Sequence, residues 1–506
     1  MTTIPAFWAD RFVLFGFPLS TLSLVYIIVA PIVAQRVLAF VYGRYLHPLA
    51  QFPGPAAAAS STRWLYKVSM TGHAEEAFEV LHERYKIKAL RIAPNELHIS
   101  DVHQYNIIYA HSEVFPIYTR FYDAFDIPFS VGGEADIGLH KERRQLMSPF
   151  YSRGSLFNAE GVMHERAVAL VNKIHNITKI QPSIDIIKAI TCHVLDVTIT
   201  SAFAYPSNLI EKEEGSFAPS LIRAFDGLDG IFWKYLEWPI FMRWVSAIPK
   251  QLYPVKPAND AKSEEIANAA KKYVNHYENH GNPFSHPVLL DHISAVPKEQ
   301  KLSYAIELLF SSADTISSSL TTGIINILLN PDIEKKLVDS LDQAKVNEDG
   351  NLDLVDLEKI SYLVACVKES VRVGNSIPGR LPRIVPNLSQ PLVVDEKVIP
   401  AGTVVSISAY TMNFSQELWG SDAKTFNPDR WLKSNKKLRQ ELYSFSKGSR
   451  MCPGQNLTYG EMTILMGYLF KNFKLSLPPN FRMPEVKDWF PAKYPPSGVH
   501  IKFESV

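Results

Sequence analysis

A loop that carries Cys452 combines residue types that can hold a metal-containing cofactor. It reads Phe445-Ser446-Lys447-Gly448-Ser449-Arg450-Met451-Cys452-Pro453-Gly454 and directly precedes an apolar stretch, residues 455–470, that predicts a helix. The backbone N–H groups and the positive end of such a helix lower the pKa of a cysteine and favour its thiolate. Cys452 is therefore predicted to be a metal ligand.

Four other positions in this loop suit a flat cofactor with acidic groups. Gly448 and Gly454 permit a tight turn and a close approach of the backbone to the cofactor. Arg450 can pair with a carboxylate of the cofactor, and Phe445 can pack on the sulfur side of its ring. Each of the four is predicted to bind the cofactor or to shape its site.

The chain has three cysteines, Cys192, Cys366 and Cys452, which lie far apart and form no C-x-x-C pair. An odd number with this spacing argues against a disulfide framework or a cysteine zinc site, and it is typical of a reducing compartment. We interpret Cys192 and Cys366 as buried free cysteines. The same interpretation of Cys452 would require its four spaced neighbours to coincide by chance.

The Cys452 loop resembles the haem-binding loop of the cytochrome P450 family, F-x-x-G-x-R-x-C-x-G, at every fixed position. The resemblance extends over nearly the whole chain. It implies a mainly α cytochrome P450 fold with a large helical domain and a smaller β-rich lobe. It also implies that haem b lies between the helix of Thr315 and this loop, with Cys452 as the axial ligand of the iron.

Two further motifs occur in the family's order. Glu369-Ser370-Val371-Arg372 fits E-x-x-R, and Phe426-Asn427-Pro428-Asp429-Arg430-Trp431 stands where the family has F-x-P-x-R. Charges three residues apart on a helix can pair locally, although such pairs also occur on many solvated helices. The resemblance implies a structural ion network of Glu369, Arg372 and Arg430 that braces the haem loop.

Basic residues at three places could bind an anionic group. His140 and Arg144 are one helical turn apart and can reach the same anion from one helix face. The resemblance implies that they contact a haem propionate, with histidine in place of the tryptophan of the family's W-x-x-x-R site. A solvated basic helix start is the alternative. Arg383 is a similar propionate candidate, with Arg380 as its rival.

Ser311-Ser312-Ala313-Asp314-Thr315 lies within a long, weakly polar helix predicted for residues 302–329. An acid and a hydroxyl inside an apolar helix are costly unless they have a partner, which makes them functional candidates. The stretch resembles the family's oxygen-activation segment, which implies that Asp314 and Thr315, with Ser312 beside them, are catalytic and relay protons to oxygen. Helix capping, or a Thr hydroxyl bonded to its own backbone, is the alternative.

Aromatic residues gather just before the predicted helix of His140. They are Phe115, Phe121, Tyr122, Phe125 and Phe129. The family often places a substrate-facing loop here, which implies contact with substrate. Core packing is the alternative for each of them.

The N-terminal segment has the composition of a membrane span. Residues 12–35 are dominated by Leu, Val, Ile, Phe and Ala, and no charge lies between Arg11 and Arg36. This matches the roughly 20 apolar residues that cross a bilayer, whereas a cleaved signal, the alternative, uses about 7 to 15. Because positive residues follow the span, we expect a single-pass anchor in the endoplasmic reticulum with residues 1–11 in the lumen and the catalytic body in the cytosol.

Beyond the anchor, residues 36–55 are basic and proline-rich and predict a stiff hinge, and residues 56–506 form the catalytic domain. The predicted helices of this domain include residues 74–85, 155–174, 184–202, 302–329, 357–373 and 455–470, and the predicted strand segments include 90–92, 96–99 and 392–409.

Charge and motifs restrict the partners. The formal net charge of +1 gives no reason to expect nucleic acid, and no glycine-rich phosphate motif predicts NADPH binding. The resemblance implies electrons from NADPH through a separate reductase that holds FAD and FMN, NADPH–cytochrome P450 reductase, with cytochrome b5 as a further candidate donor. A docking patch for an acidic reductase surface, or else a solvated charge run, is formed by Lys433, Lys436, Lys437, Arg439 and Lys447.

The resemblance implies a haem-thiolate monooxygenase that inserts one oxygen atom of O2 into a hydrophobic small molecule. Gly379-Arg380-Leu381-Pro382-Arg383 resembles fungal members that oxidise terpenoid or polyketide intermediates of secondary metabolism. Ser312 replaces a common glycine and Ile316 a frequent second hydroxyl, yet Thr315 is retained, which favours monooxygenation. The alternatives are an oxygen-independent haem-thiolate isomerase or dehydratase and a non-enzymatic haem-binding protein.

Overall fold

Helices make up most of the computed structural model, which describes residues 13–14, 17–18, 21–110, 115–226, 228–247, 258–432 and 442–506. The α-helices are α1 (Thr21–Val41), α2 (Arg63–Ser69), α3 (Ala74–Tyr85), α4 (Thr119–Tyr122), α5 (Ile137–Met147), α6 (Arg153–Thr178), α7 (Ile186–Phe203), α8 (Ser220–Phe225), α9 (Ile231–Glu237), α10 (Pro239–Ala247), α11 (Ala258–His280), α12 (Leu289–His292), α13 (Lys298–Leu328), α14 (Pro331–Leu341), α15 (Leu354–Leu357), α16 (Ser361–Gly374), α17 (Ala409–Asn413), α18 (Gln416–Trp419) and α20 (Gln455–Asn472).

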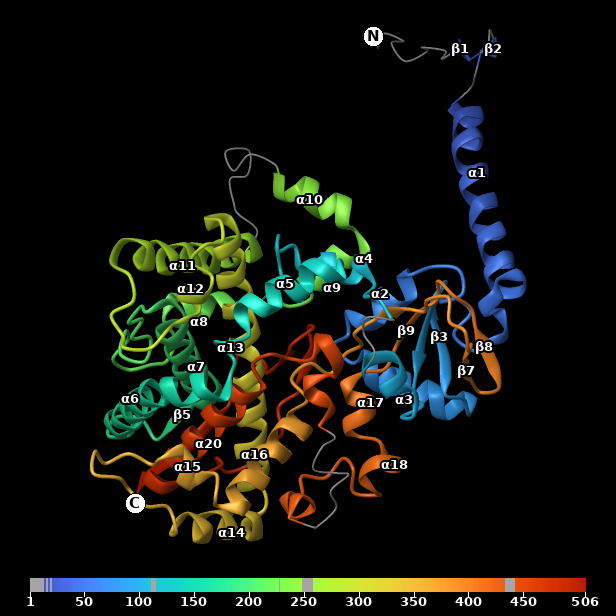
Figure 1. Ribbon diagram of the computed structural model, residues 1–506. Helices are drawn as coiled ribbons and strands as arrows, with labels where there is room; N and C mark the ends of the chain where they lie inside the picture. The colour runs from blue at the N-terminus through green and yellow to red at the C-terminus, as the bar shows by residue number, and fades with distance from the viewer. Residues whose placement is uncertain are drawn as a thin grey trace, which may run out of the picture.

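Short strands form small sheets. They are β1 (Val13–Leu14), β2 (Phe17–Pro18), β3 (Ala89–Ala93), β4 (Glu96–Ile99), β5 (Ser183–Asp185), β6 (Arg383–Ile384), β7 (Leu392–Val394), β8 (Lys397–Ile399), β9 (Val404–Ser406), β10 (Phe473–Ser476), β11 (Lys487–Asp488), β12 (Ala492–Lys493) and β13 (His500–Ser505). The mainly helical body and the smaller β-rich lobe predicted from the sequence are confirmed (Figure 1).

Helix α13 runs through the middle of the helical part, with α7 and α16 packed along it (Figure 1). Its C-terminal half is buried although it is rich in Ser and Thr. Ser317 donates a hydrogen bond to the Ala313 carbonyl at 2.6 Å, and Thr322 to the Ser318 carbonyl at 2.8 Å. Thr322 Oγ1 also lies 2.8 Å from Tyr494 Oη. Bonds to the helix's own backbone, with such outside partners, therefore allow these hydroxyls to be buried.

The β-rich lobe is built on a four-stranded sheet of order β3-β4-β9-β6. Strand β4 pairs antiparallel with β3 and parallel with β9, and β9 pairs antiparallel with β6. The proline-rich segment is docked on this sheet, because Phe52 is buried and the Pro53 carbonyl accepts a hydrogen bond from Arg91 N at 2.8 Å. A Cβ added to Gly54 would lie 2.2 Å from the Arg91 carbonyl oxygen, so only glycine fits this contact.

Helix α1 stands away from the body (Figure 1) and continues past residue 35, where the sequence predicted the anchor to end. Its described side chains are exposed and, apart from Gln35 and Arg36, apolar, including Tyr26, Ile32 and Leu38. Part of the predicted anchor, residues 12, 15–16 and 19–20, lies outside the described residues. By length and composition, one helix of the described chain, α7, could cross a membrane, but 78% of it is buried inside the protein.

The sequence did not predict that the segment 184–202 opens with a strand. β5 pairs antiparallel with β13, which in turn pairs with β10. These partners lie about 300 residues further along the chain, so local periodicity could not reveal the pairing.

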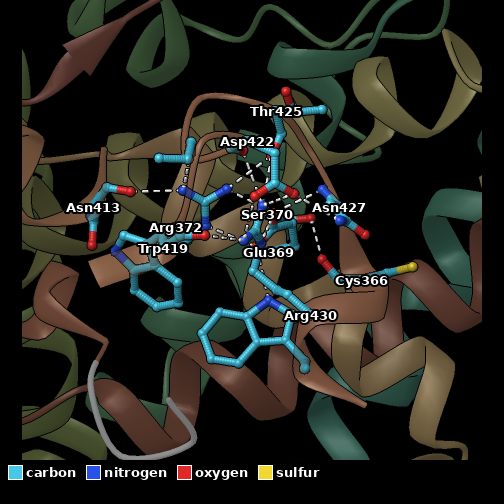
Figure 2. A network of polar contacts seen from close by, with 12 residues as sticks. Cys366, Glu369, Ser370, Arg372, Asn413, Trp419, Asp422, Thr425, Asn427 and Arg430 are labelled. Carbon is cyan, nitrogen blue, oxygen red and sulfur yellow. Dashed lines mark hydrogen bonds and ion pairs between the residues drawn. The ribbon is translucent and has the colours of Figure 1, made fainter. Parts of the chain in front are cut away.

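A buried charge network ties α16 to the segment that leads into the Cys452 loop (Figure 2). Glu369 accepts hydrogen bonds from Arg372 Nε at 2.9 Å and Arg430 Nε at 3.0 Å, and also from Trp431 Nε1 at 2.8 Å. Arg372 Nη1 donates to the Asn413 carbonyl at 2.7 Å. The Asn413 side chain reaches Ser444 Oγ at 2.9 Å, so the network extends to the residue before Phe445.

We predict that Glu369→Gln destabilises the protein by about 3–5 kcal/mol, because it leaves two buried guanidinium groups without their carboxylate. Urea denaturation followed by circular dichroism measures this change. Asp339→Asn is the matched control, since Asp339 pairs with Lys335 on the exposed face of α14 and its loss should leave the midpoint nearly unchanged. Equal midpoints for the two variants would contradict the prediction.

Candidate functional site

The Cys452 loop folds back on itself before α20. Phe445 O accepts a hydrogen bond from Cys452 N at 2.8 Å, and Gly448 O accepts one from Met451 N at 3.1 Å. Gly448 has a φ of 73°, which is the left-handed conformation expected of the glycine. Ser446 also has a positive φ, of 58°, which residue patterns could not predict because serine rarely adopts this conformation.

The Cys452 thiol lies at the start of α20 and is partly exposed. Burial raises its pKa, while the backbone N–H of Gly454 and the charge of Arg144 lower it. The backbone at the helix end therefore acts in the expected direction, but desolvation of the thiolate outweighs both favourable contributions, so the net pKa of Cys452 is raised in the protein alone. A bound metal ion would favour the thiolate by its own charge.

Phe445 and Gly454 are the neighbours of the thiol for which the sequence predicted a role in cofactor binding. Phe445 is buried and packs edge-on against Tyr459, with ring centroids 5.3 Å apart. A Cβ added to Gly454 would lie 3.8 Å from Cys452 Sγ, an ordinary contact. The protein alone therefore does not require glycine at position 454.

Four basic side chains from three separate segments share one region beside Cys452. His140 and Arg144 come from α5, Arg383 from β6, and Arg450 from the loop. Burial and the charges of Arg450, Arg144 and Arg383 lower the pKa of His140 to about 4. Burial and the nearby Arg383 lower the pKa of Arg450 to about 10. The region has an excess of positive charge.

The donors of this region are incompletely paired. Within the described chain, Arg450 Nη1 and Arg383 Nε are buried without a hydrogen-bond partner. Arg383 Nη1 donates to Tyr122 Oη at 2.6 Å, which fixes the guanidinium in place. Buried unpaired donors are costly, and two of them on charged groups fit an anionic ligand such as a pair of carboxylates. Arg380, the rival of Arg383, is already paired with Glu96 at 2.8 Å.

The middle of α13 is accessible, in contrast to its buried C-terminal half, because Ser311 is exposed and Asp314 and Thr315 are partly exposed. Thr315 Oγ1 donates to the Ser311 carbonyl at 2.7 Å, and Ser312 Oγ donates to the Leu308 carbonyl at 2.9 Å. This is the backbone bonding that the sequence left open as an alternative. Each hydroxyl oxygen retains lone pairs that can accept a hydrogen bond.

Asp314 has a partner that the sequence did not reveal. Its Oδ2 lies 3.2 Å from Lys493 Nζ, and both side chains are largely buried. Lys493 belongs to β12 and also donates to the Phe225 carbonyl at 2.8 Å. The pair is 179 positions apart in the chain, so only the fold brings it together.

The aromatic residues before α5 separate into different environments. Phe121 and Phe125 pack with Phe232 of α9, each at 5.0 Å between ring centroids, and Phe125 also lies 4.7 Å from Phe490. We call these four residues the aromatic cluster. Tyr122 lies beside this cluster, with its ring centroid 5.4 Å from that of Phe121, and its hydroxyl accepts a hydrogen bond from Arg383. Phe115 belongs to the core of the β-rich lobe, and Phe129 is exposed.

Most of the expected docking patch, Lys433, Lys436, Lys437 and Arg439, lies outside the described residues. Lys447 is described, and its Nζ donates to Asn106 Oδ1 at 3.0 Å.

Comparison with known proteins agrees with this geometry. The sequence model described as "Cytochrome P450" matches residues 135–503. The chain is 26% identical over 455 residues to cytochrome P450 monooxygenase aneF of Aspergillus aculeatus, covering 86% of this chain and 90% of the relative. It is 29% identical over 474 residues to the fusicoccadiene C-8 hydroxylase of Phomopsis amygdali, covering 87% and 88%.

A third relative is cytochrome P450 monooxygenase TRI4 of Trichoderma arundinaceum, 26% identical over 455 residues, with 86% of each chain covered. The region matched by the family model includes His140, Arg383 and the whole Cys452 loop, and it spans most of the chain. The chain therefore belongs to the cytochrome P450 family.

Proposed function

We propose that this cytochrome P450 monooxygenase hydroxylates a hydrophobic terpenoid or polyketide intermediate of fungal secondary metabolism, with electrons from NADPH delivered by a separate reductase. The observation that carries the proposal is the combination of a partly exposed Cys452 thiol with buried, unpaired donors of Arg450 and Arg383 beside it. A thiolate and two anion-binding arginines are what a haem with two propionates requires.

The residues that would hold haem b are those of the basic region and the loop. Cys452 would ligate the iron, and His140, Arg144, Arg383 and Arg450 would bind the propionates. Bound through a thiolate, haem supplies the reductive activation of O2 that oxygen insertion into a C–H bond needs.

The middle of α13 has the groups for proton delivery. Lys493 holds Asp314 Oδ2 in a fixed position, and Thr315 Oγ1 has lone pairs free to accept a hydrogen bond. Because Ser311 on the same stretch is exposed, solvent protons can reach it. We propose that Asp314 takes up a proton and passes it towards Thr315 Oγ1, with Ser312 as a further hydroxyl beside them.

The nature of the substrate is supported by the aromatic cluster and by one relative. Phe121, Phe125, Phe232 and Phe490 offer an apolar wall without a charged group of their own. The fusicoccadiene C-8 hydroxylase is named for hydroxylating a diene at a carbon position. We extend to this chain the reaction type, oxygen insertion into an apolar molecule.

The electron donors belong to the proposal as well. The FAD- and FMN-containing NADPH–cytochrome P450 reductase, and cytochrome b5 as a second candidate, would dock on the side of the Cys452 loop. Lys447 is the described basic residue of that side that could take part.

Attachment to the endoplasmic reticulum membrane is supported by two exposed apolar helices. The apolar side chains of α1 face solvent, and α10 exposes Ile240, Phe241 and Trp244, of which Ile240 is 85% exposed. Such surfaces favour the interface and interior of a bilayer. We propose that α1 anchors the chain in the membrane, that α10 lies against the cytosolic leaflet, and that the catalytic body faces the cytosol.

The haem-thiolate assignment predicts that reduced protein treated with carbon monoxide has the red-shifted Soret band of thiolate ligation. Cys452→Ala should lose this band, because no other thiol lies at the site. Cys366→Ala is the matched control, since Cys366 is buried elsewhere on α16. A band that persists in Cys452→Ala, or product formed without NADPH and O2, would contradict the proposed function.

Asp314→Asn should lower product formation by about 10²-fold, because an amide cannot transfer the proton that a carboxyl group carries. Coupled assays with reductase, measuring product formed and hydrogen peroxide released per NADPH, test this. The control is Asp332→Asn in the exposed first turn of α14, which should behave as wild type. Full turnover by Asp314→Asn would exclude Asp314 from proton delivery.

We predict that a variant starting at Tyr42 binds phospholipid vesicles more weakly than the full chain, and that adding Phe241→Ser and Trp244→Ser abolishes sedimentation with vesicles. Val338→Ser is the control, because Val338 is also exposed but lies on α14, at the opposite end of the molecule from α10 (Figure 1). Equal binding of all variants would refute the two-helix attachment.

A further inference from the structure

A second carboxylate on α13, Glu307, is engaged by a loop in a way that the proposed chemistry does not use. Glu307 and Asp314 are seven residues apart, and therefore lie on the same face of the helix, two turns from each other. Asp314 holds Lys493, whereas Glu307 faces residues 126–136, the segment between the aromatic cluster and α5.

Three donors of this segment converge on the Glu307 carboxylate. Val131 N donates to Oε2 at 2.8 Å, Gly132 N donates to Oε1 at 2.8 Å, and Ser130 Oγ donates to Oε1 at 3.0 Å. Both carboxylate oxygens therefore act as acceptors. An amide in the same place would turn an N–H group towards a backbone N–H, so glutamine cannot replace glutamate here without losing a bond.

The contact between Glu307 and the segment 126–136 is closely packed. A Cβ added to Gly132 would lie 3.1 Å from Glu307 Oε1, closer than an ordinary van der Waals contact. Ser130 Oγ also accepts a hydrogen bond from Gly133 N at 3.0 Å, so the turn is ordered around the same hydroxyl. Arg143, which pairs with Glu134 at 2.7 Å, supplies positive charge nearby.

The segment held by Glu307 is strained. Phe129, directly before Ser130, has a φ of 58°, a left-handed conformation that is rare for a bulky aromatic residue. Its ring is also 42% exposed, with the Arg143 guanidinium 5.7 Å from the ring centroid. Such a conformation persists where surrounding contacts impose it, and the Glu307 bonds are the neighbouring contacts that can do so.

The segment of residues 126–136 connects the aromatic cluster to α5. On its N-terminal side it continues into the turn of Phe125, and on its C-terminal side into α5 with His140 and Arg144. Movement of the segment would therefore separate the aromatic cluster from the basic region. We propose that Glu307 is a positioning residue that fastens residues 126–136 to α13, and that release of this clasp admits ligands to the site.

Only the admission of ligands rests on the proposed haem site; the contact between Glu307 and residues 126–136 does not. The clasp itself is tested by hydrogen–deuterium exchange of the resting full-length protein, followed at the amides of Val131 and Gly132. Glu307→Gln should raise their exchange rate by about tenfold or more, because the isosteric amide loses at least one of the bonds. Ser130→Ala removes one donor to Glu307 and the acceptor of Gly133 N, and it should give a smaller increase because both backbone bonds to Glu307 remain.

The control for exchange is Glu299→Gln, an exposed acid in the first turn of the same helix, which should match wild type. Unchanged exchange in Glu307→Gln and Ser130→Ala would overturn the clasp. Because Ser130→Ala adds no bulk or charge, it keeps the test valid should Glu307→Gln fail to fold.

The gating step is tested with 4-phenylimidazole, a nitrogen ligand of ferric haem whose binding shifts the Soret band. In stopped-flow mixing, Glu307→Gln should bind this probe several-fold faster than wild type, with Ser130→Ala between them. Faster exchange without faster binding would overturn the gate. A wild-type protein without any haem spectrum would refute the proposed function instead, and the exchange measurements would still decide on the clasp.

Discussion

The placement of buried positive charge is the constraint on which this structure depends. Glu369 sits between Arg372 and Arg430, and together the three residues join α16 to the chain that leads into the Cys452 loop. Removing a charge from water costs several kcal/mol unless partners replace the solvent, and here hydrogen bonds and an opposite charge do so. The charges of this network are paired, and the network is bonded to Ser444 at the beginning of the Cys452 loop. It therefore supports the loop that holds Cys452 before α20.

In the basic region beside Cys452, by contrast, arginine side chains are incompletely paired. Arg383 is as buried as the arginines of the network and Arg450 is partly buried, but each retains a donor without a partner in the described chain. Burial, together with the charges of these cationic neighbours, lowers the pKa of His140 to about 4. The contrast separates two arrangements of arginine. In one set the charge is paired within the folded protein, and in the other set an unpaired donor is left that, in the proposed function, an anion would satisfy.

Local patterns predicted much of this arrangement. The helix at 74–85 and the strand at 96–99 have the predicted bounds, and the loop of Cys452 and the helix after it were predicted from glycine, proline and apolar spacing. The motif around Glu369 also led to the charge network. Apart from Arg430, which lies 61 positions after Glu369 and was assigned to the network through the family resemblance, these features are encoded within a few residues of one another, where periodicity and turn chemistry are informative.

What the sequence could not predict depends on pairs that are distant in the chain. Lys493 meets Asp314, and β5 meets β13, only because the helical body brings their segments together. The upward shift in the pKa of Cys452 has the same origin, since desolvation is a property of the surroundings and not of the helix that follows. Nor does any pattern around Glu307 indicate that a loop 175 positions earlier would donate to it.

The docked proline-rich segment has a mechanical consequence. Phe52 is buried and the Pro53 carbonyl accepts a hydrogen bond from Arg91 N. These two contacts restrict rotation of the chain relative to the β-rich lobe at this point. Residues 42–51 join Val41 to Phe52. A rotation of α1 would therefore be passed to β3 through this short connection. Because this connection is short, the orientation of α1 restricts the tilt of the body relative to it.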